Sequence, residues 1–207
     1  MNYDVILLAG GKGKRCGLSH NKVLHPLKDG HSILYHAYKI FEEDEDCKRI
    51  ILVISNEDLK EIDFRSDKIF IAQNGKERTN SVYNGLVKAH EKYVLIHDGA
   101  RPYLLKEDLE KLKSALIEYG AAILGHAVKD TIKIVDNGII KETPRREKLY
   151  MAFTPQAFIR EELLACYKEL DGVYSDDASL IETKRDVKLV EGSLTNIKIT
   201  YPEDLDG

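Results

Sequence analysis

The sequence has few cysteines, no excess of basic residues and no long apolar run. Its 207 residues include three cysteines, an odd number without a Cys-x-x-Cys pair, which argues against a disulfide framework and a cysteine metal site. The 31 basic and 35 acidic residues create no general basic field, which argues against binding to nucleic acid or to an anionic membrane. A membrane-spanning helix needs about 20 consecutive apolar residues, and no apolar run in the sequence approaches that length. We therefore expect a cytoplasmic protein with neither of these partners.

Short apolar runs alternate with amphipathic segments along most of the chain. Runs typical of strands buried on both faces occur at residues 5–9, 49–55, 68–72, 93–97 and 121–128. Between them, apolar residues recur at helical spacing after Ser32, around Leu86 and between Leu105 and Leu116. This order predicts one α/β domain over residues 1–207, with a mostly parallel twisted sheet and helices on both faces.

The pattern changes after Val128. Alternating residues on both sides of Asp136-Asn137-Gly138 predict a β-hairpin, and its many lysines and arginines indicate an arm that projects from the domain. We expect this insertion at about residues 130–152. Helices are expected next at residues 160–169 and 176–184, and two short strands and a turn at the end of the chain.

A glycine-rich loop, AGGKGKRCG, follows the first predicted strand. No Gly-Lys pair in it is followed by Ser or Thr, so it lacks the P-loop pattern. Cys16 stands where a dinucleotide-binding loop has a third small residue, and no clear ribose-binding acid ends the second strand. A solvated basic turn is the remaining ordinary interpretation.

The charges around this loop favour an anion site. No acidic residue lies between Asp4 and Asp29, and the basic residues in this window are Lys12, Lys14, Arg15, Lys22 and Lys28. Glycines let backbone N–H groups approach phosphate oxygens, and basic side chains neutralise them. The loop therefore has the composition of a triphosphate site at the carboxyl end of a strand.

Several segments, in order, resemble one family. They are LAGGKGKRCGLSHNKVLHPL, NGKERTNSVYNGL, VLIHDGARPYL, KDTIK, AFTPQAF, YSDDASLIE and VEGSLTNIKITYPEDL. The first resembles the signature loop of sugar-phosphate and polyol-phosphate nucleotidyltransferases, and the ordered set resembles the 2-C-methyl-D-erythritol 4-phosphate cytidylyltransferase family over essentially the whole chain. The resemblance implies a Rossmann-like fold, a dimerisation arm, and Mg²⁺-dependent transfer from CTP to a polyol phosphate with release of pyrophosphate.

The resemblance also implies roles for individual residues. It implies transition-state stabilisation by Arg15, Lys22 and Lys198. It implies nucleotide binding by Ala9, Gly10, Gly11, Gly13, Gly75, Arg78, Ser81, Asp98, Gly99 and Ala100. It implies substrate binding by Arg101, Thr131, Arg146 and Thr154, with Asp176 and Ser179 as further candidates. Asp98 is also the expected Mg²⁺ ligand, and Thr131 and Arg146 are expected to complete the site of a partner subunit.

Ordinary structural roles are alternatives for some of these residues. Asp98 and Asp176 are suited to capping a turn or helix, Ser81 to starting a helix, and Arg101 to a structural salt bridge. Asn21 replaces the proline that commonly precedes the family's lysine, which predicts a less rigid approach to Lys22. Ribitol-5-phosphate cytidylyltransferases share most of these motifs, although Ala100 favours the methylerythritol enzymes. A nucleotide-binding protein without catalysis is the second alternative function, after the ribitol enzyme.

Overall fold

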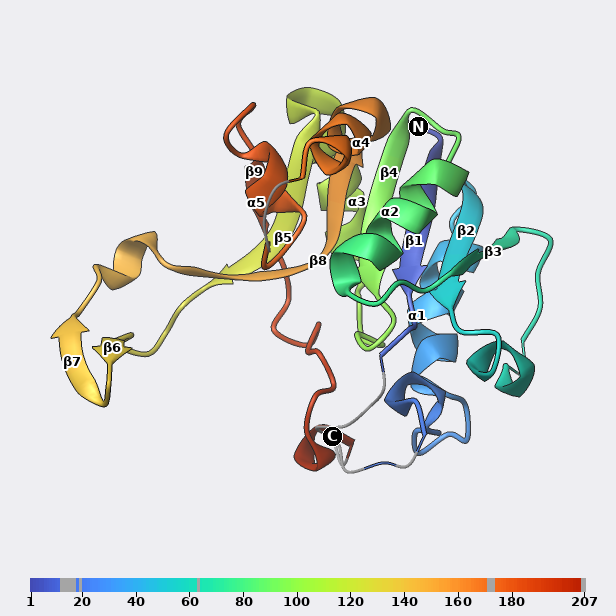
Figure 1. The fold of residues 1–207 in the computed structure, drawn as a ribbon, viewed down its shortest axis with the longest axis horizontal. Helices are drawn as coiled ribbons and strands as arrows, with labels where there is room; N and C mark the ends of the chain where they lie inside the picture. The colour runs from blue at the N-terminus through green and yellow to red at the C-terminus, as the bar shows by residue number, and fades with distance from the viewer. Residues whose placement is uncertain (12–17, 19, 63, 171–173, 206–207) are drawn as a thin grey trace.

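The computed structural model describes residues 1–11, 18, 20–62, 64–170 and 174–205 (Figure 1). A seven-stranded sheet in the order β3-β2-β1-β4-β8-β5-β9 forms the centre. Its strands are β1 (Tyr3–Leu8), β2 (Cys47–Ile54), β3 (Ile69–Gln73), β4 (Tyr93–Asp98), β5 (Ala121–Ala127), β8 (Tyr150–Ile159) and β9 (Lys188–Glu191). All neighbouring strands pair in parallel except β8, which is antiparallel to β4 and β5. The predicted mostly parallel sheet is confirmed.

Helices cover both faces of this sheet. They are α1 (Ile33–Glu42), α2 (Arg78–Lys88), α3 (Lys106–Tyr119), α4 (Arg160–Lys168) and α5 (Ala178–Ile181). Helices α1 and α3 pack on one face and contribute Phe41 and Leu112 to one apolar core. Helices α2, α4 and α5 pack on the other face, where Leu86 and Leu163 belong to a second core. None of the helices in the described part of the chain is long and apolar enough to cross a membrane.

The first helix begins where the sequence predicts it. The Ser32 hydroxyl accepts a hydrogen bond from the backbone N–H of Tyr35 and so caps α1. Leu34, Ala37 and Phe41 then lie on one buried stripe against the sheet. The described residues also form short 3₁₀ turns at η2 (Lys22–Leu24), η3 (Asp58–Glu61), η4 (Arg146–Lys148) and η5 (Pro202–Leu205).

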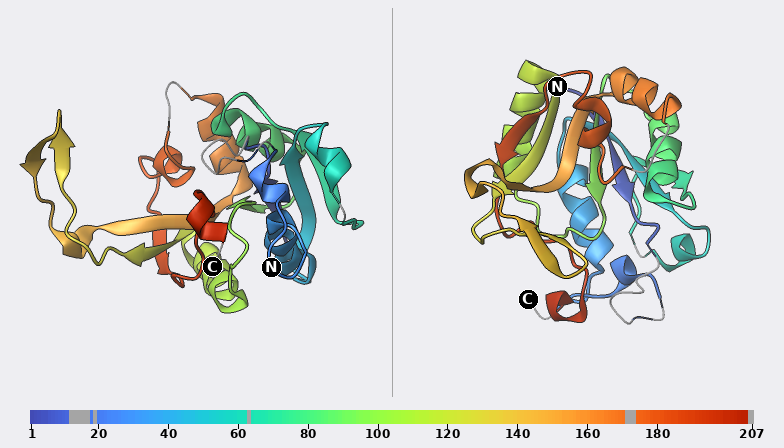
Figure 2. Two further views of the ribbon diagram at one scale, coloured as in Figure 1. Left: turned by 90° about the horizontal axis from the view of Figure 1, so that it is seen from below. Right: turned by 60° about the vertical axis from the view of Figure 1, so that its left-hand side comes forward.

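The predicted hairpin projects from the body of the molecule, as two further views show (Figure 2). Strands β6 (Ile134–Asp136) and β7 (Ile139–Glu142) pair antiparallel around Asn137 and Gly138. Both turn residues have positive φ, 50° and 77°, as a two-residue hairpin turn requires. All residues of both strands are exposed. The arm therefore gains no burial from its own domain.

Three details differ from the sequence-based expectation. Strand β8 lies in the middle of the sheet, although its sequence reads as the end of the insertion and contains Pro155. This proline is tolerated because it lies at the register shift between β8 and β5. Helix α5 is much shorter than residues 176–184. One strand, β9, replaces the two expected near the end, and the following segment is held to the domain by the Ile199 N–H, which donates to the Ala100 carbonyl.

Candidate active site

A cavity of about 760 Å³ opens at the carboxyl ends of β1 and β4. Its lining residues are Leu8, Gly10, Gly11, Lys22, Val23, Gln73, Asn74, Gly75, Lys76, Glu77, Arg78, Ser81, Asp98, Ala100 and Lys198. This is the edge at which open α/β sheets bind ligands. The fold therefore brings most of the predicted nucleotide-binding residues, and two of the three predicted catalytic residues, to one cavity.

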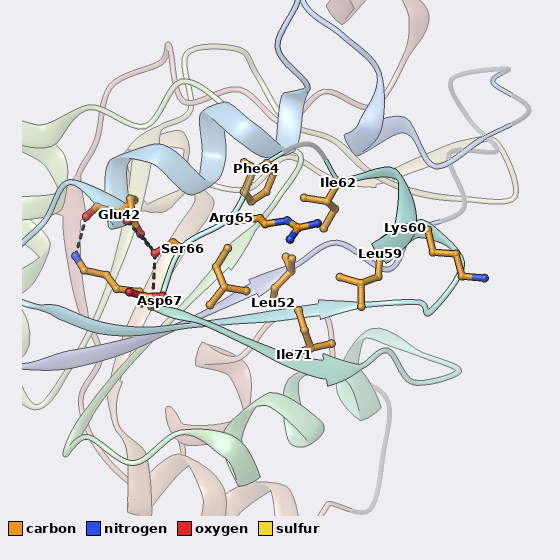
Figure 3. A pocket seen from close by; sticks show the side chains of 12 residues that line it. Glu42, Leu52, Leu59, Lys60, Ile62, Phe64, Arg65, Ser66, Asp67 and Ile71 are labelled. Carbon is orange, nitrogen blue, oxygen red and sulfur yellow. Dashed lines mark hydrogen bonds between the residues drawn. The ribbon is translucent and has the colours of Figure 1, made fainter.

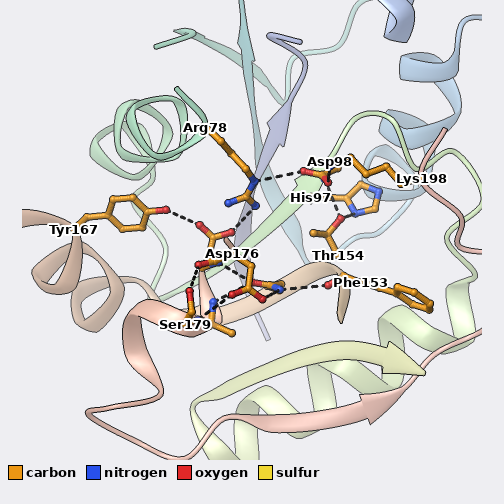
Figure 4. Close-up of polar contacts among 12 residues, drawn as sticks. Arg78, His97, Asp98, Phe153, Thr154, Tyr167, Asp176, Ser179 and Lys198 are labelled. Atoms are coloured by element: carbon orange, nitrogen blue, oxygen red, sulfur yellow. Dashed lines mark hydrogen bonds and ion pairs between the residues drawn. The ribbon is translucent and has the colours of Figure 1, made fainter. Parts of the chain in front are cut away.

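Asp98 ends β4 and lies between two cations (Figure 4). Its Oδ2 is 2.6 Å from Lys198 Nζ, and its Oδ1 is 3.8 Å from Arg78 Nε. Burial by itself raises the pKa of the Asp98 carboxyl, but Lys198 and Arg78 outweigh burial and lower the pKa to about 2. Asp98 is therefore ionised at neutral pH, as a metal ligand must be.

Hydrogen bonds behind Asp98 fix the backbone at the end of β4. The Asp98 N–H donates to Thr154 Oγ1 over 3.0 Å, and this hydroxyl lies 3.1 Å from His97 Nδ1. His97 Nε2 lies 3.1 Å from the Arg101 carbonyl and must donate to it, so Nδ1 accepts from Thr154. Burial lowers the pKa of His97 to about 4, which agrees with this neutral ring. Thr154 thus holds the backbone of Asp98 in place, and it is not among the residues that line the cavity.

Arg101 is also buried beneath the cavity. Its Nη1 donates to the Asn196 carbonyl over 2.7 Å, and its guanidinium lies over the Phe153 ring. Asn196 Nδ2 in turn donates to the Thr154 carbonyl over 2.9 Å. These bonds tie the segment that carries Lys198 to the turn after β4 and to β8. No carboxylate forms a salt bridge with Arg101 among the described residues, so the salt bridge stays a prediction. Substrate contact by Arg101 stays a prediction as well.

The start of α2 forms the wall of the cavity opposite β1. Ser81 Oγ accepts from the Gly75 N–H over 2.9 Å and donates to the Glu77 carbonyl over 3.1 Å. A Cβ at Gly75 would collide with Asn80, so the close turn needs glycine. Ser81 therefore shapes the loop at the start of the helix, and its predicted contact with a nucleotide stays a prediction.

Asn21 holds the turn that presents Lys22. Its side chain accepts from the Val23 N–H and donates to the Ala9 carbonyl and to Asp58. Its φ of −64° is one that proline also adopts. We expected the turn to be less rigid without the proline, but these hydrogen bonds hold it in place. Lys22 Nζ donates to the Ile199 carbonyl and so bridges this turn to the segment beside Lys198.

The other predicted site residues are not among the described residues that line the cavity. Gly13 and Arg15 are outside the described residues. Ala9 and Gly99 lie beneath the cavity, where their N–H groups donate to Val53 and Leu8 carbonyls and join neighbouring strand ends. Thr131 and Arg146 lie on the exposed arm, where Arg146 Nη1 donates to the Lys129 carbonyl.

Asp176 and Ser179 lie at the start of α5. Asp176 Oδ1 accepts from the Ser179 N–H, which is the capping arrangement that the sequence also allowed. Asp176 Oδ2 accepts from Gln156 Nε2 of β8. The structure therefore gives these two residues a local structural role, and their substrate contact stays a prediction.

Sequence reasoning missed the acid next to Asp176. Asp177 is fully buried, and its carboxylate accepts from Arg78 Nη2 and from the Tyr167 hydroxyl, each over 2.6 Å. The adjacent aspartates were the only signal in the sequence, and nothing there shows which one is buried. Asn74, Lys76 and Glu77 were also missed as lining residues, although the quoted NGKERTNS motif contains them.

Among the described residues of the cavity, Asp98 fits Mg²⁺ as a carboxylate ligand, but there is no complete set of protein ligands. No cluster of three or more metal-ligating side chains exists among the described residues. Asp98 provides one ionised carboxylate, and none of the described residues donates a hydrogen bond to its Oδ1. Mg²⁺ commonly binds through one or two carboxylates together with substrate phosphates and water. Asp98 is therefore suited to hold Mg²⁺ that also contacts a triphosphate.

A larger cavity of about 980 Å³ lies beside β2 and β3, away from these residues (Figure 3). Aliphatic side chains such as Leu52, Leu59 and Ile71 form its floor. Two acids, Glu42 and Asp67, line it, and Glu42 already accepts from the Ser66 hydroxyl. None of its described lining residues is a glycine, whereas Gly10, Gly11 and Gly75 line the smaller cavity, so the smaller cavity is the better candidate for phosphate chemistry.

Comparisons with known proteins point to one family. Residues 3–206 match the family model of 2-C-methyl-D-erythritol 4-phosphate cytidylyltransferase. Relatives with this name from Geobacillus kaustophilus and Bacillus licheniformis are 40% and 41% identical, over 99% of this chain and 94% and 93% of theirs.

Solved structures also share the fold. The 4-diphosphocytidyl-2C-methyl-D-erythritol synthase of Anaerococcus prevotii has a TM-score of 0.87 at 28% identity, over 99% of this chain and 93% of that one. The 2-C-methyl-D-erythritol 4-phosphate cytidylyltransferase of Francisella tularensis has the same TM-score and identity, over 100% and 97%. The predicted fold class and family resemblance are confirmed. The chain belongs to the 2-C-methyl-D-erythritol 4-phosphate cytidylyltransferase family.

Proposed function

We propose that this protein transfers the cytidylyl group of CTP to 2-C-methyl-D-erythritol 4-phosphate and releases pyrophosphate, a step in non-mevalonate isoprenoid synthesis. The observation that carries the proposal is the convergence of Lys22, Arg78, Asp98 and Lys198 on one cavity in a chain of this family. These side chains come from four separate segments. A solvated basic turn would not bring them together.

The chemistry needs charge stabilisation more than a general base. A phosphate oxygen of the polyol attacks the α-phosphorus of CTP, a new P–O bond forms, and the bond to the β-phosphate breaks as pyrophosphate leaves. Because the attacking oxygen is already anionic, positioning and electrostatics dominate such a reaction. We assign Lys22 and Lys198, which both line the cavity, the stabilisation of the α-phosphate as its charge rises, and we assign Arg15 the same role from the family motif.

Asp98 is the proposed Mg²⁺ ligand. The ion would neutralise phosphate charge when bound, together with oxygens of CTP. The chain's own contribution is the fixed, ionised Asp98 carboxylate. Gly10, Gly11 and Gly75 line the cavity in which we propose that the triphosphate and the base bind.

We further propose a homodimer in which the arm enters the partner's site. The support is an exposed apolar surface on the arm, since Ile134, Val135, Ile139 and Ile140 are 47–61% exposed. An isolated two-stranded hairpin is marginally stable in water, so these side chains need a partner. Thr131 and Arg146 on the arm would then bind the polyol phosphate of the neighbouring site. The cytoplasm is the proposed location, and the unpaired Cys47 and Cys166 agree with it.

The test is a comparison of two acceptors. Purified protein with CTP and Mg²⁺ should release pyrophosphate faster with methylerythritol phosphate than with ribitol 5-phosphate. The reverse preference would assign the protein to the ribitol reaction. Binding of CTP without turnover of either acceptor would favour a nucleotide-binding protein that lacks catalysis.

A further inference from the structure

Asp177 is a buried carboxylate that the proposed reaction does not use. It is fully buried and is not among the residues that line the cavity. Its Oδ2 accepts from Arg78 Nη2, and its Oδ1 accepts from the Tyr167 hydroxyl of α4. A buried charge is tolerated when it is paired and hydrogen-bonded, and here one cation and one phenol do so.

The backbone at Asp177 is held just as firmly. Gln156 Oε1, from the central strand β8, accepts from the N–H groups of Asp177 and Ala178, each over 3.1 Å. Burial chiefly raises the pKa of Tyr167, so its hydroxyl remains a donor. Asp177 is thus a fixed acceptor built from β8, α4 and the start of α5.

Arg78 lies between two carboxylates, Asp177 and Asp98. Its Nη2 is 2.6 Å from Asp177 Oδ2, whereas its Nε is 3.8 Å from Asp98 Oδ1. The first distance is a charge-assisted hydrogen bond and the second is too long for one. Arg78 is therefore committed to Asp177, although its side chain is 31% exposed and belongs to the cavity wall.

We propose that Asp177 is a positioning residue that holds Arg78 back from Asp98 and so keeps Asp98 Oδ1 open for the Mg²⁺ that accompanies CTP. This inference rests on the proposed function. Asp98 Oδ2 is already occupied by Lys198. If Arg78 moved onto Oδ1, two cations would occupy the carboxylate and would compete with the metal ion. Asp177 prevents this by offering Arg78 a better partner.

The experiment measures how much Mg²⁺ improves CTP binding. Calorimetry gives the Kd of CTP in Mg²⁺ and in EDTA, for the wild type and for Asp177→Asn. We expect the gain from Mg²⁺ to fall about tenfold in the variant, a typical size for coupling between two ligands. The Kd in EDTA should change by less than about threefold, since Arg78 remains in the cavity wall.

A matched control separates this effect from loss of structure. Asp4→Asn changes another fully buried aspartate, which accepts from the His90 and Glu91 N–H groups at the far end of β1. It should leave the gain from Mg²⁺ unchanged, even if it lowers the melting temperature. If Asp177→Asn weakens CTP binding equally in Mg²⁺ and in EDTA, Asp177 is merely structural and the inference is wrong.

A double variant tests whether Asp177 acts through Arg78. In Arg78→Gln/Asp177→Asn the cation is gone, so the gain from Mg²⁺ should return toward the wild-type value, although CTP binds more weakly overall. A double variant with the same small gain as Asp177→Asn would overturn the inference. Failure of the proposed function looks different, because the wild type itself would then release no pyrophosphate with either acceptor.

Discussion

Lys198 Nζ lies 2.6 Å from Asp98 Oδ2, and the pair joins positions 100 residues apart in the sequence. Lys198 follows β9 in an irregular segment, and Asp98 ends β4. The segment is fixed by Asn196, which bonds to Thr154 and Arg101. The pair therefore depends on the tertiary fold, and it places a cation beside the proposed metal ligand.

Replacing Lys198 should impair catalysis more than folding. We expect Lys198→Met to lower kcat about 10²–10³-fold, the usual cost of removing one group that stabilises transition-state charge. Steady-state kinetics and thermal unfolding would check this. Lys188→Met removes an exposed lysine of β9 whose Nζ lies over the Tyr119 ring, and it should change neither result by much. Equal rates for wild type and Lys198→Met would contradict the assigned role.

Lys22→Ala should also act on kcat. Lys22 is buried and donates a hydrogen bond to the Ile199 carbonyl, so its side chain is already fixed at the cavity before any ligand binds. We expect a fall in kcat of about 10²–10³-fold, with a much smaller change in the KM of the polyol phosphate. The opposite pattern, a raised KM with an unchanged kcat, would make Lys22 a substrate-binding residue.

Arg146→Ala should mainly raise the KM of the polyol phosphate, since the arm is proposed to bind that substrate. An unchanged KM would show that the assignment of the arm is wrong. Whether the arm acts on the partner's site is a separate question that kinetics of one variant does not answer.

Co-expression of two defective chains answers it. A dimer of one Arg146→Ala chain and one Lys22→Ala chain has one site with an intact Lys22 and an intact partner arm. When the polyol phosphate is kept well below its KM for wild type and for Arg146→Ala, random pairing should therefore restore roughly a quarter of the wild-type activity in a symmetric dimer. If the arm serves its own subunit, the mixed preparation should be no more active than the two variants measured separately.

A charged cluster far from the cavity should contribute stability that depends on pH. Lys113 Nζ lies 2.9 Å from Asp44 Oδ2 and 2.7 Å from Asp46 Oδ2, and its side chain is 6% exposed. Burial by itself raises the pKa of Asp44, but the hydrogen bonds from Lys113, the Asp46 N–H and Tyr3 together outweigh it and lower the pKa. The bond to Lys113 is the main cause that lowers the pKa of Asp46. Lys113→Met should lower the free energy of unfolding by about 1.5–3 kcal/mol at neutral pH.

The sign of the pH effect follows from these lowered pKa values. Stabilisation of an ionised carboxylate is fully present above its unfolded pKa, here 3.8, and is lost as pH falls through its lower folded pKa. Urea unfolding should therefore show the difference between wild type and Lys113→Met shrinking below about pH 4. Lys111→Met, which removes a more exposed lysine of the same helix, should cost less than about 1 kcal/mol.

Local signals made much of the fold predictable. Ser32 caps α1 through a neighbouring N–H, and Asn137-Gly138 forms a two-residue turn, so a few adjacent residues determine each feature. Strand β8 could not be predicted in the same way. Its central position in the sheet depends on pairing with β4 and β5 on either side. The proline within it would by itself indicate an edge strand or no strand.

The sequence by itself determined the family, the alternation of strands and helices, and the chemical types in the glycine-rich loop. Those properties follow from residue order and local periodicity. Only the tertiary structure decided that Asp177, rather than Asp176, binds Arg78, and that Asn21 replaces the rigidity of a proline with hydrogen bonds. Asp177 is 99 residues from Arg78, and whether such a charge is buried and paired is decided when β8, α2 and α4 pack together.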